Sequence, residues 1–416
     1  MKAAILTVGT EILFGQIVNT NAAFISKRLN DLGIDVMYHY TVGDNEDRLE
    51  ALIKEIFQEC DLIITTGGLG PTQDDLTKNI VAKVMGDKLI THNESLRRIK
   101  DFFVKIGKPM TENNIKQAYL PSKAKVLMND YGSAPGFVSK VDDKIIMCLP
   151  GPPREMEPMF VNYAENYLKQ FTDCVIYYEF VKTIGIGESI LETELLDLID
   201  GQVDPTIATY ANEGESYLRI TSKRETYDEA KKAVDDIIDK VRDRVGQYIY
   251  AIGDKQLAEV VVDLLKDNNL TISSAESCTG GLFADSIISI SGTSSIFDRA
   301  LVTYSNKAKI EELGVSKETL DTYGAVSEQT AREMVEGLSK ASSSDICISV
   351  TGIAGPDGGT IEKPVGLVYT ALKYKDQIIC KENRFRNTGR NSIRRRSVMK
   401  MLEMIYNMIG GIDEKR

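Results

Sequence analysis

The chain has 416 residues, of which 43% are hydrophobic and 27% charged, and its formal net charge is −11 at pH 7. This length predicts two to three domains of about 150 residues each, and the apolar content is sufficient for sizeable cores. The acidic balance argues against direct nucleic-acid binding, which requires a positive field. No apolar run reaches the ~18 residues that a membrane span needs, so we expect no membrane partner.

Six cysteines are scattered through the chain without a CxxC pair. This pattern is typical of reduced core thiols, and the N-terminal apolar stretch is too short for a signal peptide. We therefore predict a cytoplasmic protein. A structural zinc site is not expected, because neither cysteines nor histidines are paired.

Residues 1–168 alternate between strand-like and helix-like segments. We predict strands at 3–8, 34–40, 61–66 and 144–149, a helix that begins at Asn19-Thr20 and stops at Gly33, and a helix at 46–59. Asn19 is a suitable N-cap and Gly33 a suitable C′ residue. Strands separated by helices of this length predict a parallel sheet covered on both faces.

Glycines and carboxylates gather where the strand at 61–66 ends. The candidate binding residues at or near this edge are Glu11, Asp44, Gly67, Gly68, Gly70, Asp74 and Asp75. Glycine amides suit phosphate oxygens, and Asp74 and Asp75 are suitable ligands for a hard divalent cation. The alternative is that these two aspartates only cap the next helix.

A second unit spans residues 169–252. We predict two or three strands, at 175–184, 206–210 and 216–222, and helices at 188–200 and 226–245. This pattern is α+β and holds few reactive side chains.

Residues 253–416 form a third unit with an α/β pattern. Strands are expected near residues 270, 300, 346, 367 and 380, followed by a final helix through Met399 and Ile409. Three joints between strand and loop or helix contain glycine or polar residues: 277–281, 301–309 and 348–359. In a parallel sheet such joints meet at the carboxyl edge, where ligands bind. A functional site is therefore predicted at this edge.

The chemistry of the third unit points to a nucleophile without a histidine. Ser277 and Cys278 are the candidate nucleophiles, and the only histidines of the chain, His39 and His92, lie far upstream. We favour Ser277, since a cysteine without a thiolate-stabilising group is more often a buried core thiol.

A serine hydroxyl needs a base within hydrogen-bond reach, and a lysine whose pKa is lowered by burial is the usual substitute for histidine. Lys307 and Lys309 both follow Tyr304, and their spacing lets only one of them face the site. The amides of Gly280 and Gly281, at a helix N-terminus, are expected to form an oxyanion hole.

An arginine-rich segment from Arg384 to Lys400 carries no carboxylate. It is either the solvated face of a helix that begins near Asn391 or an anion site for a small phosphorylated ligand.

Five motifs in the third unit carry a family resemblance: AESCTGG, VTYSNKAK, GAVSEQTA, TGIAGPDGGT and EKPVG, in this order. They resemble the C-terminal domain of the CinA (competence/damage-inducible protein A) family, which is similar to the PncC nicotinamide-nucleotide amidohydrolases. The resemblance implies deamidation of nicotinamide mononucleotide to nicotinic acid mononucleotide and ammonia, without a cofactor, in the recycling of pyridine nucleotides. It also implies a homodimer.

The same resemblance assigns roles to residues. It implies that Ser277 is the nucleophile, Lys309 the preferred base and Tyr304 a proton relay. The other positions that match the lining or activating residues of the family are Thr279, Asn306, Thr351 and Arg394. Gly280, Gly281 and Gly352 are further predicted substrate-binding residues.

The first unit resembles another domain through the motifs VGTEILFGQIVNTN, TTGGLGPTQDD and LPGPPREM. These are similar to the molybdopterin-binding (MoCF) domain at the front of CinA proteins. The resemblance implies a metal-dependent ADP-ribose pyrophosphatase, with Asp44 and Asp75 at the acidic positions and an unspecified divalent metal. Related cofactor-synthesis enzymes have GGTG where this chain has GGLG at 67–70, which speaks against molybdopterin synthesis.

The sequence therefore predicts a bifunctional α/β hydrolase of three domains. A MoCF-like parallel-sheet domain is expected at 1–168, a small α+β domain at 169–252 and an α/β deamidase domain at 253–416. Two alternatives stay open. The first domain is only a nucleotide- or molybdopterin-binding module, or the chain is a non-enzymatic accessory protein in competence or DNA damage.

Overall fold

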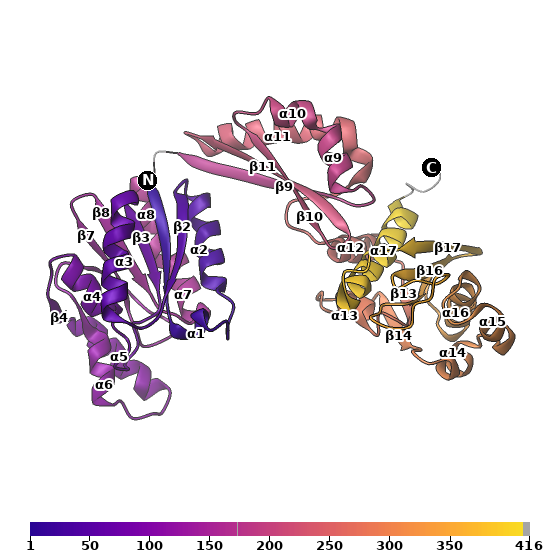
Figure 1. The fold of residues 1–416 in the computed structure, drawn as a ribbon, viewed down its shortest axis with the longest axis horizontal. Helices are drawn as coiled ribbons and strands as arrows, with labels where there is room; N and C mark the ends of the chain where they lie inside the picture. The colour runs from indigo at the N-terminus through magenta and orange to yellow at the C-terminus, as the bar shows by residue number, and fades with distance from the viewer. Residues whose placement is uncertain (173, 411–416) are drawn as a thin grey trace. The chain divides into compact units, whose positions relative to one another are not determined.

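A computed structural model describes residues 1–172 and 174–410. The chain divides into two compact units, and Figure 1 labels their helices and strands. Unit 1 comprises Met1–Tyr177 and Ser222–Lys232, and unit 2 comprises Tyr178–Thr221 and Ala233–Arg416. Each unit has its own hydrophobic cores. In the described part of the chain, no helix is both long enough and apolar enough to cross a membrane.

Unit 1 is built on a six-stranded sheet in the order β2-β1-β3-β8-β7-β6. Its strands are β1 (Lys2–Val8), β2 (Asp35–Val42), β3 (Leu62–Thr66), β6 (Lys125–Leu127), β7 (Gly136–Val141) and β8 (Lys144–Leu149). The four strands β2, β1, β3 and β8 are parallel neighbours, which confirms the predicted parallel sheet. Strands β7 and β6 add an antiparallel edge that the sequence did not predict.

Helices cover both faces of this sheet. The helices are α1 (Thr10–Leu13), α2 (Thr20–Asp31), α3 (Glu46–Glu59), α4 (Thr77–Val84), α5 (Asn93–Lys105), α6 (Glu112–Ile115), η1 (Lys116–Ala118), α7 (Pro153–Met159), η2 (Phe160–Ala164), α8 (Glu165–Leu168) and η3 (Lys169–Phe171), and a two-stranded sheet joins β4 (Leu89–Thr91) to β5 (Tyr119–Pro121). Ile5 packs with α2 and α7, while its neighbour Leu6 packs with α3 and α4. This alternation follows from the two-residue period of a strand, and it explains why the interior strands are apolar on both faces.

The ends of α2 form as predicted. Asn19 accepts a hydrogen bond from the amide of Ala22 at 3.1 Å, and Gly33 adopts a φ of 76° just beyond the last turn. This left-handed conformation favours glycine.

The middle segment forms a four-stranded sheet in the order β10-β11-β9-β12. Its elements are β9 (Val175–Thr183), α9 (Glu188–Glu194), α10 (Leu196–Asp200), β10 (Thr206–Asn212), β11 (Glu215–Arg224), α11 (Tyr227–Val245), η4 (Gly246–Tyr248) and β12 (Ile249–Ile252). The single helix predicted at 188–200 is wrong, because the chain breaks it at Leu195, whose φ is −115°. The Leu195 side chain is fully buried, so packing overrides its local helix propensity.

The C-terminal part of unit 2 is a five-stranded sheet in the order β14-β13-β15-β16-β17. Its elements are α12 (Leu257–Asp267), β13 (Ile272–Glu276), α13 (Leu282–Ile288), β14 (Phe297–Val302), α14 (Asn306–Leu313), α15 (Lys317–Tyr323), α16 (Glu328–Ala341), β15 (Ile346–Gly352), β16 (Leu367–Tyr374), β17 (Gln377–Arg384) and α17 (Arg390–Gly410). Helices α12, α13 and α17 cover one face, and α14, α15 and α16 cover the other. Strands β14, β13 and β15 are parallel, so their carboxyl ends share one edge.

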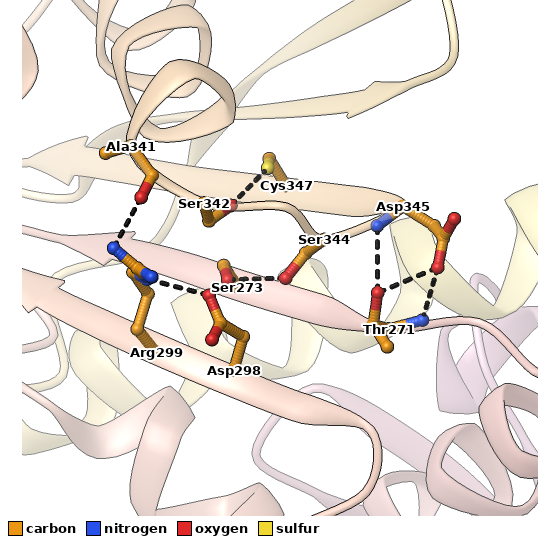
Figure 2. Close-up of polar contacts among 9 residues, drawn as sticks. All are labelled: Thr271, Ser273, Asp298, Arg299, Ala341, Ser342, Ser344, Asp345 and Cys347. Carbon is orange, nitrogen blue, oxygen red and sulfur yellow. Dashed lines mark hydrogen bonds and ion pairs between the residues drawn. The ribbon is translucent and has the colours of Figure 1, made fainter.

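A polar network fastens the opposite, amino-terminal edge of these three strands (Figure 2). Asp345 accepts hydrogen bonds from the amide and the hydroxyl of Thr271, at 2.8 and 2.7 Å. Ser273 and Ser344 share a hydrogen bond of 2.7 Å. These bonds join the starts of β13 and β15 at the end of the sheet remote from the predicted site.

Candidate active sites

Ser277 is the first residue after β13. Its amide donates to the carbonyl of Val350 in the neighbouring strand β15 at 3.1 Å, which anchors the residue to the sheet. The chain then turns into α13 through Gly280 and Gly281, whose φ angles of 60° and 92° lie in the left-handed region. Ser277 is buried but lines a cavity, so its hydroxyl is placed on a rigid element and still reaches a ligand.

Lys309, on α14, points its ammonium group at Ser277. Its Nζ donates to Ser277 Oγ at 3.0 Å and to the carbonyl of Thr303 at 2.8 Å. The side chain is 1% exposed, and burial lowers the pKa of Lys309 from its ordinary 10.5 to about 8. Lys307 is exposed and pairs with Glu311 at 3.7 Å. Of the two lysines, the structure brings only Lys309 to the serine.

The cavity at this edge has a volume of about 230 Å³. Its lining residues are Ser277, Cys278, Tyr304, Lys309, Ala325, Val326, Thr351, Gly352, Ala354 and Arg390. Burial raises the pKa of the Cys278 thiol to about 12, so the group is protonated at neutral pH. A protonated thiol is a poor nucleophile. The geometry therefore favours Ser277 as the nucleophile.

Arg390, the first residue of α17, was not among the residues predicted from the sequence. One of its nitrogens donates to the carbonyl of Gly355 at 2.7 Å, and another donates to the hydroxyl of Tyr304 at 3.0 Å. Because the Tyr304 hydroxyl accepts this bond, its own proton remains available for donation. The tyrosine predicted to relay protons thus contacts Arg390, and Lys309 reaches Ser277 directly.

The predicted oxyanion hole does not form at Gly281. The amides of Gly281 and Phe283 donate to Glu276 Oε2 at 3.0 and 3.1 Å, and the amide of Ala284 donates to Glu276 Oε1 at 2.9 Å. The Glu276 carboxylate is fully buried and occupies the N-terminus of α13, where negative charge is favourable. Gly280 and Gly281 also do not line the cavity. The Glu276 carboxylate therefore accepts the amide hydrogen bond at Gly281 that was predicted to bind the substrate oxygen.

Arg394 binds the protein backbone. Its Nε and Nη2 donate to the carbonyl of Thr279 at 3.2 and 2.7 Å, so it holds the turn that follows Ser277. Thr279 is fully buried and Asn306 is exposed, and neither of them lines the cavity. Thr351 and Gly352 do line it, and the Thr351 hydroxyl donates to a backbone carbonyl at 2.7 Å.

The arginine-rich segment from Arg384 to Lys400 was interpreted either as a solvated helix face or as an anion site, and neither interpretation describes it fully. Arg390 faces the cavity, Arg394 holds a backbone turn, and Arg395 forms an ion pair with Glu213 at the β10–β11 hairpin. The sequence held a signal for Glu276, because a carboxylate next to a glycine-rich helix start is a typical capping group. No local signal distinguishes Arg390 from Arg394, which lies one helical turn later.

A second candidate site is a cleft of about 570 Å³ in unit 1. All seven residues predicted for this edge line it: Glu11, Asp44, Gly67, Gly68, Gly70, Asp74 and Asp75. A Cβ on Gly67 would lie 2.1 Å from the carbonyl oxygen of Val8. The glycine is therefore required for close backbone packing as well as for its φ of 105°.

Two of the predicted carboxylates are already hydrogen-bonded. Asp75 accepts from the amides of Gly70 and Thr72, both at 2.8 Å, and so braces the glycine loop. Asp44 accepts from the amide and hydroxyl of Thr10 at 3.2 and 2.8 Å. Asp74 is exposed. In the residues that the structure describes, no three His, Cys, Asp or Glu side chains are grouped as metal ligands.

The charged side chains that line the cleft are all acidic. Its carboxylates are Glu11, Asp44, Asp74, Asp75 and Glu155, and among the described residues that line it none is lysine, arginine or histidine. The sequence prediction missed Glu155, which accepts from the amide group of Asn129 at 2.8 Å. It also missed Asn21, whose buried Oδ1 has no hydrogen-bond partner in the described structure.

These oxygens fit a divalent cation. Magnesium-like ions take one or two carboxylates and complete their coordination with substrate phosphates and water, so a preformed cluster of three ligands is not needed. The carboxylates of this cleft repel an anionic ligand unless a bound cation screens them.

The fold and the sites define a protein with a MoCF-type α/β domain, a small middle domain and a serine–lysine α/β domain. Three family models match it: the probable molybdopterin binding domain at residues 4–170, the damage-inducible protein CinA KH domain at 179–251 and the CinA C-terminal domain at 254–409. A CinA-like protein of Dictyoglomus turgidum is 48% identical over 413 residues, with 99% of this chain and 98% of that protein covered. The chain belongs to the CinA family.

A second relative is similar over nearly the whole chain, and a solved structure matches a smaller part. A CinA-like protein of Kosmotoga olearia is 47% identical over 405 residues and covers 97% of this chain and 98% of its own length. Among solved structures, competence/damage inducible protein CihA from Agrobacterium tumefaciens is 44% identical. That match covers 37% of this chain and 93% of that chain, with a TM-score of 0.36.

Proposed function

We propose that residues 253–416 hydrolyse the carboxamide of nicotinamide mononucleotide to nicotinic acid mononucleotide and ammonia. The observation that carries the proposal is the 3.0 Å hydrogen bond from buried Lys309 Nζ to Ser277 Oγ. A lysine with a pKa of about 8 is neutral in about a tenth of molecules at pH 7, so it can accept the serine proton.

In the proposed reaction, neutral Lys309 takes the proton of Ser277 while the serine oxygen forms a bond to the carboxamide carbon. The carbon–nitrogen bond then breaks, and the protonated lysine returns its proton to the departing nitrogen, which leaves as ammonia. Water hydrolyses the resulting ester, with Lys309 again as the base, and releases the carboxylate. Each proton that the lysine takes is returned, so the cycle needs no cofactor.

The cavity accounts for the way the substrate would bind. Its volume of about 230 Å³ is below the ~300–1,000 Å³ of pockets for drug-sized ligands, so it suits the pyridine ring with its carboxamide. The rest of the nucleotide would extend past Tyr304, which is 62% exposed. Arg390 and the Tyr304 hydroxyl are two hydrogen-bond donors of the cavity that could bind oxygen atoms of the substrate.

The test is ammonia release from nicotinamide mononucleotide by the full chain and by its Ser277→Ala variant. The variant is expected to lose activity at least ~100-fold, because no other activated nucleophile lines the cavity. Lys307→Met is the matched control, and it is expected to retain activity because Lys307 is exposed and turned towards Glu311. Activity retained by Ser277→Ala would refute the serine mechanism. An inactive wild-type chain would favour the accessory-protein alternative.

We propose a second activity, metal-dependent hydrolysis of ADP-ribose, for the cleft of unit 1. The supporting observation is the combination of a glycine loop with five carboxylates and no cationic side chain among the described lining residues. When bound, a divalent cation would neutralise the pyrophosphate and polarise its phosphorus–oxygen bonds. Asp44 is our candidate ligand for it, because both hydrogen bonds from Thr10 end on Oδ2, whereas both oxygens of Asp75 accept bonds within the glycine loop.

The second activity is tested with ADP-ribose in a series of divalent metals, with release of AMP as the readout. Ser277→Ala is the control variant, since it should keep this activity and lose the deamidase. Asp44→Asn is expected to lose AMP release while ammonia release persists. Metal-dependent binding of ADP-ribose without turnover would support a binding module instead. The predicted homodimer is tested separately by light scattering of the purified chain.

A further inference from the structure

A second cavity of about 400 Å³ adjoins the acidic cleft of unit 1. The two share Gly70, Thr72 and Asp75, so the braced glycine loop forms a wall of both. Their charges differ. Whereas the described lining of the cleft has no cationic side chain, the adjoining cavity is lined by Lys78 and Lys116. A single loop thus separates an acidic space from a basic one.

Lys78 lies in the first turn of α4 and is only 4% exposed. In the described chain its Nζ makes one hydrogen bond, to the carbonyl of Lys116 at 2.8 Å, and it has no ion pair. An ammonium group carries three N–H donors, so most of its hydrogen-bonding capacity is unused. Burial lowers the pKa of Lys78 to about 8, which shows how unfavourable the site is for an unpaired charge.

Asp75, the one carboxylate in the described lining of this cavity, does not neutralise this charge. Asp75 raises the pKa of Lys78 through its charge, yet burial outweighs that effect. The oxygens of Asp75 already accept from the amides of Gly70 and Thr72. Buried charges in proteins are normally paired, because an unpaired one costs several kcal/mol. A buried lysine that lines a cavity without a counter-ion therefore marks a place for an anion.

We propose that this cavity is a subsite for a phosphate group, bound by the Lys78 ammonium inside and by the exposed Lys116 ammonium at the rim. Both are point charges that suit a phosphate dianion. The bound anion would favour the charged form of Lys78 and remove the penalty of its burial. The subsite needs no metal and is independent of the hydrolysis of ADP-ribose.

The probe is inorganic phosphate, titrated calorimetrically into the full chain in the presence of EDTA. All proteins carry Arg390→Ala, so that the cavity near Ser277 does not contribute. In this background, Lys78→Met is expected to weaken phosphate binding at least tenfold. Lys83→Met removes the same charge from an exposed position on the same helix, where the lysine pairs with Glu50 at 2.7 Å, and is expected to leave the affinity unchanged. Equal affinity in Lys78→Met and the control would overturn the proposal.

Thermal unfolding provides a measurement that does not depend on a variant. Millimolar phosphate should raise the unfolding midpoint of the metal-free chain, since it binds only the folded state. No rise would overturn the proposal even if Lys78→Met failed to fold. AMP and ribose 5-phosphate are tested in parallel arms, to distinguish free phosphate from a phosphate monoester as the ligand. A chain that binds phosphate but does not cleave ADP-ribose would refute the second activity and leave this subsite standing.

Discussion

Replacing Lys309 by arginine separates the role of a base from that of a positive charge. Arginine keeps the charge and the hydrogen-bond donors but stays protonated at any pH of the assay, so it cannot accept the serine proton. We expect Lys309→Arg and Lys309→Met to lose ammonia release to the same extent, about 100- to 10,000-fold, which is the usual contribution of a general base. If arginine retained substantial activity, Lys309 would act by charge alone.

The lowered pKa of Lys309 also predicts how much the activity of the wild-type chain changes with pH. With a pKa of about 8, the neutral fraction of Lys309 rises from about 9% at pH 7 to about 90% at pH 9. The value of kcat/KM should therefore increase about tenfold over this range and level off above about pH 9. The assay is coupled detection of ammonia between pH 7 and pH 10. A flat profile, or one that still climbs at pH 10, would refute the assignment of the lowered pKa to the base.

The same pKa affects stability, with a definite sign. The folded-state value of about 8 lies below the ordinary 10.5, so between these values the unfolded chain binds more protons and stability rises with pH. Below pH 8 the full cost of the buried charge, roughly 3 kcal/mol, is present. Lys309→Met relieves this cost but leaves the Thr303 carbonyl without its donor, at about 1–3 kcal/mol. The two nearly cancel, so loss of activity in this variant would reflect chemistry and not unfolding.

Four further substitutions test neighbouring residues. Arg390→Ala is expected to raise KM for the nucleotide about tenfold or more, because Arg390 faces the cavity. Arg394→Ala is expected mainly to lower kcat, because it loosens the turn after the nucleophile; the reverse KM-against-kcat split would contradict both assignments. Glu276→Gln should lower the free energy of unfolding in urea by about 1–3 kcal/mol, since its carboxylate accepts three amides. The exposed control Glu318→Gln should change it little, and equal effects would show that the cap contributes nothing. Cys278→Ala should retain ammonia release, as a thiol of pKa about 12 is not a nucleophile at neutral pH; loss of activity in a folded variant would revive the cysteine mechanism.

Local sequence patterns predicted the structure correctly where it depends on residues that are close in sequence. The cap at Asn19, the glycine stop at Gly33 and the helix at Glu46–Glu59 follow from capping chemistry and helical periodicity. The same reasoning failed at Leu195, where a buried side chain breaks a helix that the local sequence favours. It also missed β7, because its pairing with β8 depends on the packing of the whole sheet.

The sequence by itself determined that this chain carries Ser277 on a strand-to-helix turn without a histidine, and that carboxylates accompany the glycine loop at 67–70. Only the tertiary structure decided which partners these groups meet. Lys309 contacts Ser277, which lies 32 residues earlier in the sequence. The Gly281 amide that was predicted to bind substrate donates to Glu276. Arg390 lines the cavity, where Arg394 was predicted to lie. The physical reason is that contacts between elements depend on the phase of each helix and the order of the strands. A difference of one helical turn or two residues leaves no trace in the local pattern, yet it moves a charged group from the cavity to the backbone or to solvent.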